Sequence, residues 1–181
     1  MSTPEVPGHT VLQIPVPALE RFVRGRYRHY DPAFLSADPD YLHAHVTALG
    51  PFLDPSRIDD RTRDQVQEIV GTTAAFDFTM DRIDTFPDGI IHLRPEPEEA
   101  FAELTRRLIE AFPECPPYGG RYSEVVPHLT LDQRSETVTQ ASTLAALGAD
   151  LPIAGRADRL DLAWYQSNGC RLLHRWVLGR P

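Results

Sequence analysis

The sequence predicts an α+β protein built from two similar halves. Segments with strand-like alternation and segments with helical spacing follow one another in the order strand, helix, strand, helix, strand, and this order then occurs a second time. Turn signals recur at the same spacing, because Asp88-Gly89 and Asn168-Gly169 lie about 80 residues apart. Shared order and shared spacing indicate an internal duplication.

Composition limits the kinds of protein that this chain can be. Its 181 residues suit a single domain, or two small lobes that share a site, and 41% hydrophobic with 24% charged residues is ordinary for a globular protein. A formal charge of -8 argues against a long nucleic acid as partner, although a small anionic ligand remains possible. The two cysteines provide no disulfide framework, and no long apolar run occurs, so we expect a cytoplasmic, monomeric protein without a membrane segment.

Three strands and two helices are expected in the first half. Apolar residues at helical spacing begin at Leu19, and Asp31-Pro32 ends that helix. Ser56 is the expected N-cap of the second helix, with Asp59 three residues later in the manner of a capping box. The expected strands are 10–16, 44–49 and 75–85, and the expected helices are 19–30 and 56–70.

The second half repeats this order and adds one strand. Pro97 suits a first helical position, Ser135 can cap the next helix, and Gly148 marks its end. The expected strands are 90–94, 126–131, 152–165 and 170–178, and the expected helices are 97–112 and 135–148. The prediction is therefore one domain over residues 1–181, with approximate repeats 10–85 and 89–165 and a closing strand 170–178.

A His-x-Thr pattern occurs once in each half. His128 and Thr130 lie in the segment 126–131, and His45 and Thr47 lie in the segment 44–49. Side chains at positions i and i+2 of a strand point the same way. If the two strands lie side by side, two imidazoles and two hydroxyls face one spot.

These residue types can cleave a phosphodiester. Histidine has an unperturbed pKa of about 6.5, so two imidazoles can serve as general base and general acid, each contributing roughly 10²–10⁴ in rate. Threonine hydroxyls can donate hydrogen bonds to phosphoryl oxygens while charge develops there. This scheme requires no metal, and the sequence leaves open which histidine is the acid.

Taken together, the paired motifs resemble those of the 2H phosphoesterase superfamily, which includes the 2′-5′ RNA ligase-like proteins. The passage 111–120 and the ending 176–179 are also similar to a bacterial branch of that family. The resemblance extends over residues 10–180. Its matching segments are His45-Val46-Thr47, Gly50-Pro51-Phe52 and Val126-Pro127-His128-Leu129-Thr130-Leu131.

The resemblance implies a fold and an activity. The fold is two lobes, each an antiparallel sheet with helices on its outer face, around a central cleft (the LigT-like fold). His45 and His128 are then the catalytic pair, and Thr47 and Thr130 bind the phosphate. The family hydrolyses 2′,3′-cyclic phosphates, 2′-5′ linkages or related small phosphoesters without a metal or other cofactor. The expected ligand is therefore a small nucleotide or an RNA-terminal phosphoester.

Three other functions remain open. The motifs can hold a nucleotide or RNA phosphate without turning it over, or the same chemistry can join RNA as a 2′-5′ ligase. A third possibility is a zinc site at His43 and His45, because His-x-His is a metal-binding spacing.

The remaining candidates lie outside the two motifs. Tyr122 is a candidate substrate-binding residue, since it lies with Tyr118 and Arg121 in the loop before the second motif, where it can stack a base or simply pack the loop. His92 and His174 occupy expected strands and can face either the cleft or the protein's core and surface.

Overall fold

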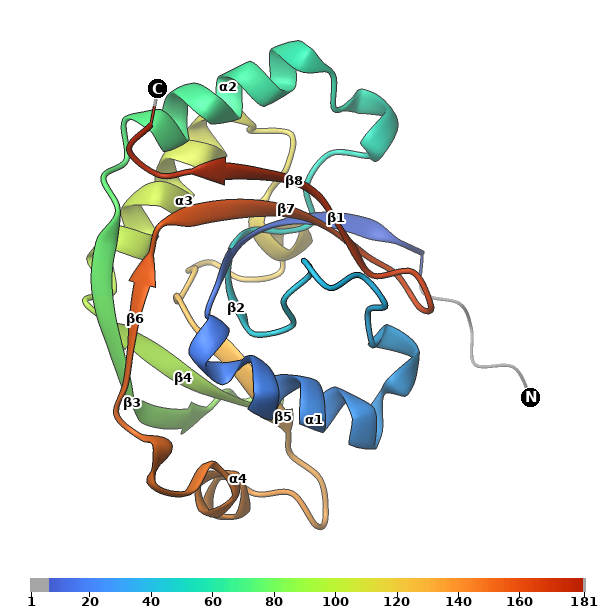
Figure 1. Ribbon diagram of the computed structural model, residues 1–181, viewed down its shortest axis with the longest axis vertical. Helices are drawn as coiled ribbons and strands as arrows, with labels where there is room; N and C mark the ends of the chain where they lie inside the picture. The colour runs from blue at the N-terminus through green and yellow to red at the C-terminus, as the bar shows by residue number, and fades with distance from the viewer. Residues whose placement is uncertain (1–6, 181) are drawn as a thin grey trace.

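The computed structural model describes residues 7–180, which form one eight-stranded antiparallel sheet with four α-helices (Figure 1). The predicted α+β class is confirmed. The strands are β1 (His9–Pro15), β2 (His45–Leu49), β3 (Phe76–Thr85), β4 (Ile90–Glu96), β5 (Leu129–Gln133), β6 (Ile153–Ala157), β7 (Arg159–Tyr165) and β8 (Arg171–Val177). The helices are α1 (Glu20–Tyr30), α2 (Asp60–Gly71), α3 (Glu99–Ala111) and α4 (Gln140–Leu147).

The strand order is symmetric about the centre of the sheet. It runs β6-β3-β4-β5-β2-β1-β7-β8, so β5 and β2 meet in the middle and each has three further strands outside it. The two sequence repeats exchange their last strands, because β3 pairs with β4 and β7 pairs with β1. Each group of four strands therefore contains residues from both repeats.

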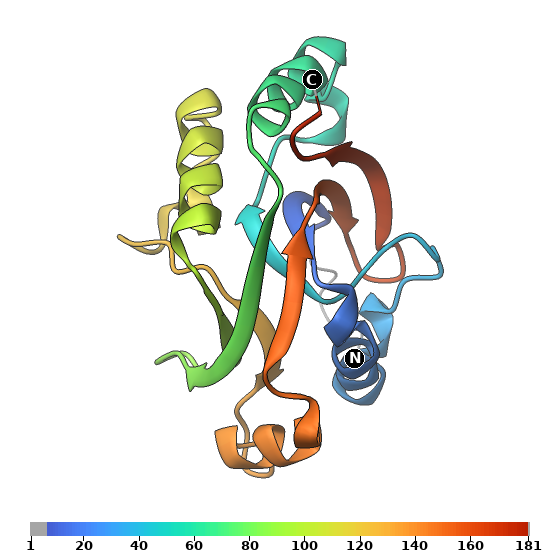
Figure 2. The same cartoon turned by 60° about the vertical axis from the view of Figure 1, so that its left-hand side comes forward.

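The helices pack against strands on both sides of the centre. α3 contacts β2, α1 contacts β5, α2 lies against α3 and β8, and α4 lies against β3. In the view of Figure 2, α3 and α1 lie on opposite sides of the molecule, with strands of the sheet between them. The apolar stripe on α3 is buried, and it consists of Phe101, Leu104, Leu108 and, at the C-cap, Phe112.

Three helix starts differ from their predictions. Asp59, not Ser56, is the N-cap of α2 and accepts the N–H of the third helical residue at 2.8 Å, because residues Pro55–Arg57 form a separate 3-10 turn. Thr139, not Ser135, caps α4 with a reciprocal capping box. The Ser135 hydroxyl instead accepts backbone N–H groups two and three residues later. Pro97 precedes α3, whose N-cap is Glu98.

Two expected strands also differ from their predictions. The expected strand 152–165 is interrupted at Asp158, so that β6 pairs with β3 while β7 pairs with β1 and β8. The second motif enters the sheet later than expected, because β5 begins at Leu129 and His128 lies just before it. Pro127 explains this shift, since proline has no N–H to donate to a strand ladder. Within residues 7–180, none of the helices is long and apolar enough to cross a membrane.

Leu129 provides a test of the central strand pairing. Its side chain is fully buried, so Leu129→Ala should lower the free energy of unfolding by about 2–5 kcal/mol through lost burial and the cavity left behind. Urea unfolding measures this loss. Leu144 is 42% exposed, so Leu144→Ala is the matched control and should cost far less; equal losses would contradict this packing.

Candidate active site

The central strands place the two His-x-Thr motifs together. Val46 of β2 lies opposite Leu129 of β5 in an antiparallel pair, and both side chains are buried in the core. The same register, continued by one residue in each direction, brings Thr47 beside His128 and His45 beside Thr130. Because neighbouring residues alternate between faces, these four side chains lie on the face opposite the core.

The four motif residues line one cavity of about 230 Å³. Its lining includes the buried polar side chains of Gln13 and His43 and the aromatic rings of Tyr27, Tyr118 and Tyr165. The remaining lining residues are His9, Val11, Gly50 and Pro51.

Both motif imidazoles are held in the same way. Nδ1 of His45 lies 2.8 Å from the carbonyl oxygen of His43, and Nδ1 of His128 lies 2.7 Å from that of Val126. A carbonyl oxygen can only accept, so each Nδ1 carries the proton and donates it. Nε2 of each ring therefore keeps its lone pair for a ligand in the cavity.

Burial favours the neutral form of both rings. It lowers the pKa of His45 to about 4, while the hydrogen bond to the carbonyl of His43 acts in the opposite direction. Burial also lowers the pKa of His128, again against the hydrogen bond to Val126. At neutral pH both rings can accept a proton, and a bound anion would favour the protonated form of either ring.

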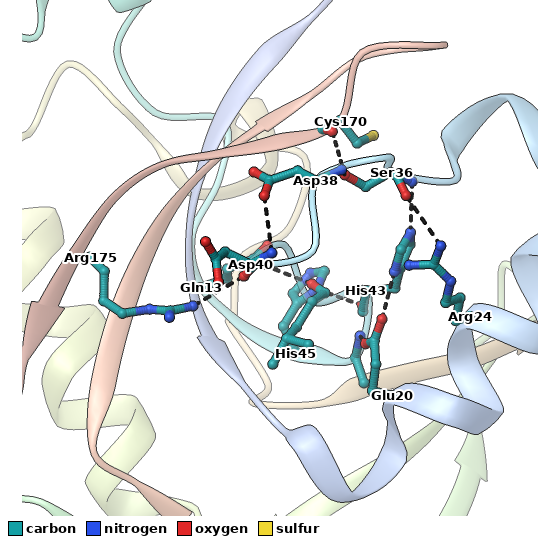
Figure 3. Close-up of polar contacts among 12 residues, drawn as sticks. Gln13, Glu20, Arg24, Ser36, Asp38, Asp40, His43, His45, Cys170 and Arg175 are labelled. Atoms are coloured by element: carbon teal, nitrogen blue, oxygen red, sulfur yellow. Dashed lines mark hydrogen bonds and ion pairs between the residues drawn. The ribbon is translucent and has the colours of Figure 1, made fainter.

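His43, considered above as a zinc ligand, is buried at the edge of the same cavity. Its side chain is 1% exposed, with Nδ1 2.7 Å from Oε1 of Glu20, and Nε2 accepts the backbone N–H of Ser36 at 3.1 Å (Figure 3). Both ring nitrogens are engaged within the protein, so the ring offers no lone pair for the zinc site considered with His45. Among the residues that the structure describes, no group of three or more His, Cys, Asp or Glu side chains has a metal-binding arrangement.

A second cavity of about 310 Å³ adjoins His128 and includes Tyr122. The Tyr122 side chain is 54% exposed, and its hydroxyl donates to Oδ2 of Asp88 at 3.2 Å. Tyr118 lines both cavities, and its ring lies roughly parallel to the imidazole of His128 at a centroid distance of 6.4 Å, whereas Arg121 lines neither cavity. The lining residues of this aromatic recess are Phe86, Pro87, Asp88, Ile90, Tyr118, Tyr122, Glu124, Val126 and His128.

Two further polar residues lie near the site, and only Gln13 was missed by the sequence analysis. His92, which the sequence left open between the cleft, the core and the surface, is buried beside Thr130, stacked on Phe86 at 3.8 Å and 5.4 Å from the ring of His128. Gln13 occupies the corresponding position in the other half, beside Thr47, and donates to the Leu42 carbonyl. The sequence does contain a signal for Gln13, because it is a polar residue inside the mostly apolar segment 10–16. His174 instead packs on Trp176 in β8.

Solved structures with a similar fold include Escherichia coli LigT and a protein described as a phosphoesterase. The structure of Escherichia coli LigT complexed with 3′-AMP superimposes with a TM-score of 0.56 at 18% identity, covering 96% of this chain and 99% of LigT. The protein TT0787 of Thermus thermophilus gives a TM-score of 0.62 at 14% identity, covering 94% of this chain and 98% of that protein. No curated protein sequence matches this chain significantly.

The sequence itself identifies the family. The family model of the 2′-5′ RNA ligase superfamily matches residues 15–169. The chain therefore belongs to this superfamily, and the resemblance to 2H phosphoesterases inferred from the two motifs is confirmed.

The low pKa of His45 predicts a loss of stability in acid. An unfolded histidine has a pKa of about 6.5. Between that value and the folded value of about 4, the unfolded state binds a proton that the folded state does not, so stability falls as the pH falls. Between pH 7.5 and pH 5, His45→Gln should lose about 1–2 kcal/mol less than the wild type. Urea unfolding at both pH values measures this difference, and identical pH dependence would contradict it.

Proposed function

We propose that this protein is a metal-independent phosphoesterase that hydrolyses a 2′,3′-cyclic nucleotide phosphate or a related small phosphodiester. His45 and His128 are the proton-transfer groups, and Thr47 and Thr130 hold the phosphoryl oxygens. The observation that carries the proposal is the pairing of Val46 with Leu129, which brings all four side chains to one cavity.

The tautomers of the two imidazoles suit this reaction. One Nε2 accepts a proton from water while the water oxygen forms a bond to phosphorus. The other ring, protonated at Nε2, gives its proton to the ribose oxygen as the phosphorus–oxygen bond breaks. Each Nδ1–H remains on a backbone carbonyl, which keeps the ring oriented and stabilises its protonated form.

The two threonines supply hydrogen bonds where charge develops. Each lies beside the histidine of the other motif, so every histidine has a hydroxyl neighbour across the strand pair. Donors fixed in advance at the phosphoryl oxygens stabilise the transition state, because they need no reorganisation during the reaction.

The structural relatives support a small nucleotide as the ligand. Escherichia coli LigT has been crystallised with 3′-AMP, phosphate, ATP and NADP+. A nucleoside monophosphate is the product expected when a cyclic phosphate is opened. The net charge of -8 agrees with a short substrate or an RNA end better than with a long nucleic acid.

The aromatic recess beside His128 is the proposed base-binding subsite. Phe86, Tyr118 and Tyr122 provide flat apolar surfaces, and such surfaces stack nucleobases without strict sequence preference. A base held there has its phosphate next to His128, since that histidine lines both cavities.

The histidines provide the main test. His45→Ala and His128→Ala should each lower kcat for a 2′,3′-cyclic nucleotide by at least about 10²-fold, because each removes one proton-transfer group. Thr47→Val and Thr130→Val should reduce kcat less, since a neutral hydrogen bond contributes less than proton transfer. Product release followed by chromatography measures these rates, with circular dichroism to confirm folding.

Full activity in either histidine variant would contradict the two-histidine mechanism. If the wild type is stabilised by nucleotides against heat but forms no product, the cavity is a binding site only. Incubation with RNA ends that carry a cyclic phosphate and a 5′-hydroxyl distinguishes joining from hydrolysis, since only joining gives a longer RNA.

Tyr122 tests the base subsite separately. Tyr122→Ala removes one stacking surface, so KM for a cyclic nucleotide should rise about tenfold, corresponding to the roughly 1–3 kcal/mol of a stacked base. Steady-state kinetics measures this change. Tyr30 is also an exposed tyrosine, so Tyr30→Ala is the matched control and should leave KM unchanged. An unchanged KM in Tyr122→Ala would place the base elsewhere.

A further inference from the structure

The orientation of His45 depends on the peptide segment that precedes it. Its Nδ1–H donates to the carbonyl oxygen of His43, two residues earlier in the chain. Any group that fixes the backbone of residues 43 and 44 therefore also fixes the direction of the His45 imidazole.

Glu20 holds this segment with both of its carboxylate oxygens. Oε1 accepts Nδ1–H of His43 at 2.7 Å, and Oε2 accepts the backbone N–H of Ala44 at 2.9 Å (Figure 3). Glu20 is the first residue of α1, where the helix dipole favours a negative charge. We call this arrangement of Glu20, His43 and Ala44 the Glu20 bridge.

The imidazole of His43 is fixed from its other edge as well. The backbone N–H of Ser36 can only donate, so Nε2 of His43 is the acceptor. Nδ1 of His43 therefore carries the ring proton and donates a hydrogen bond to Glu20. Ser36 is itself held by its hydroxyl, which donates to the Cys170 carbonyl at 2.6 Å. The rings of Tyr27 and Tyr41 pack against His43 at centroid distances of 5.5 and 5.0 Å.

Among residues 7–180, the second motif has no equivalent of this bridge. The residue before His128 is Pro127, which has no N–H to give to a carboxylate in the way that Ala44 does. Glu99, the first residue of α3, occupies the position in the second half that Glu20 occupies in the first, but its side chain is exposed. His45 and His128 therefore make the same kind of hydrogen bond through Nδ1, but only the segment before His45 is held by a carboxylate.

From these contacts we infer that Glu20 and His43 are positioning residues for His45, acting through the backbone of residues 43 and 44. This inference rests on the proposed function, and it adds to the site a carboxylate and a third imidazole that need not touch the substrate. Glu20 is a positioning residue because it reaches His45 only through its neighbours.

Loss of the bridge should change turnover more than substrate affinity. Glu20→Ala removes both hydrogen bonds, so kcat should fall about tenfold to a hundredfold, because a catalytic group misplaced by about 1 Å costs that much, while KM stays within about twofold. Glu20→Gln retains an oxygen for the Ala44 N–H but loses the carboxylate acceptor of His43, so its kcat should lie between those of Glu20→Ala and the wild type.

The charge of Glu20 also gives a pH signature. The charged and titratable groups that act on His45 are Glu20 from α1, His43 from the preceding segment and His128 from the β5 side. Of these, Glu20 raises the pKa of His45 and the two histidines lower it. In Glu20→Gln, the limb of the pH–rate profile that follows His45 should therefore move to lower pH.

The matched control is Glu99→Gln, which removes the same charge from the same helix position in the other half. It should leave kcat and the pH profile unchanged. A kcat within twofold of wild type in Glu20→Ala would overturn the inference, and so would an equal loss in Glu99→Gln. If Glu20→Ala does not fold, a wild-type kcat and pH profile in Glu20→Gln would overturn it as well.

Nitrogen-15 NMR of the imidazoles separates this inference from the proposed function, because it needs no turnover. In the wild type and in Glu99→Gln, His45 should be the Nδ1-protonated tautomer. In Glu20→Ala the two tautomers should mix. If the wild type hydrolyses no phosphodiester, the proposed function fails while this readout still tests the bridge; an unchanged tautomer in Glu20→Ala would refute the bridge alone.

Discussion

The backbone pairing of β2 with β5 is the interaction on which the rest of the structure depends. It joins two groups of four strands into one sheet, and Val46 opposite Leu129 defines its register. Helices from both sides reinforce it, since α3 packs on β2 and α1 packs on β5. Arg26 of α1 adds an ion pair at 2.8 Å to Asp132 of β5, whose side chain is 3% exposed. A buried carboxylate needs such a partner, so charge as well as packing holds α1 against β5.

The two halves of the site are more alike in their His-x-Thr motifs than in the residues that hold those motifs in place. Each histidine donates from Nδ1 to a carbonyl two residues earlier, and each lies beside the threonine of the other motif. Behind the first motif lies a hydrogen-bonded network that reaches α1 and the turn before β8. The second motif is preceded by Pro127 and by an aromatic recess. A substrate thus meets two similar proton-transfer groups in two different surroundings, which allows the groups to take different roles.

Local sequence patterns were sufficient to predict most of the elements, because periodicity and turn residues act over a few positions. The class and the order of strands and helices along the chain were available in this way. The caps were predicted less well, because Ser56 and Ser135 each have another good cap within four residues and the surrounding turns decide between them. The break between β6 and β7 depends on which strands lie next to them in space, and no local pattern contains that information.

The motif residues could be found because they occur twice in matched contexts. Glu20 could not, since it lies 23 residues before His43 and only the packing of α1 brings them together. His43 was misleading for a related reason: the spacing His-x-His is typical of metal ligands, yet its hydrogen bonds use both ring nitrogens. Arg24 and Arg26 of α1 likewise bond to partners that no local pattern identifies, the Ser36 carbonyl and Asp132.

The exchange of strands between the repeats has a consequence for how the chain acquires its structure. β1 cannot complete its pairing until β7 has been synthesised, and β3 needs β4 and β6 from the second repeat. Neither group of four strands can therefore form from one repeat alone. The residues that pair β1 with β7 and β3 with β6 are far apart in the sequence. Such non-local contacts slow folding. His45 and His128 also come from different repeats, so neither repeat alone can form the site.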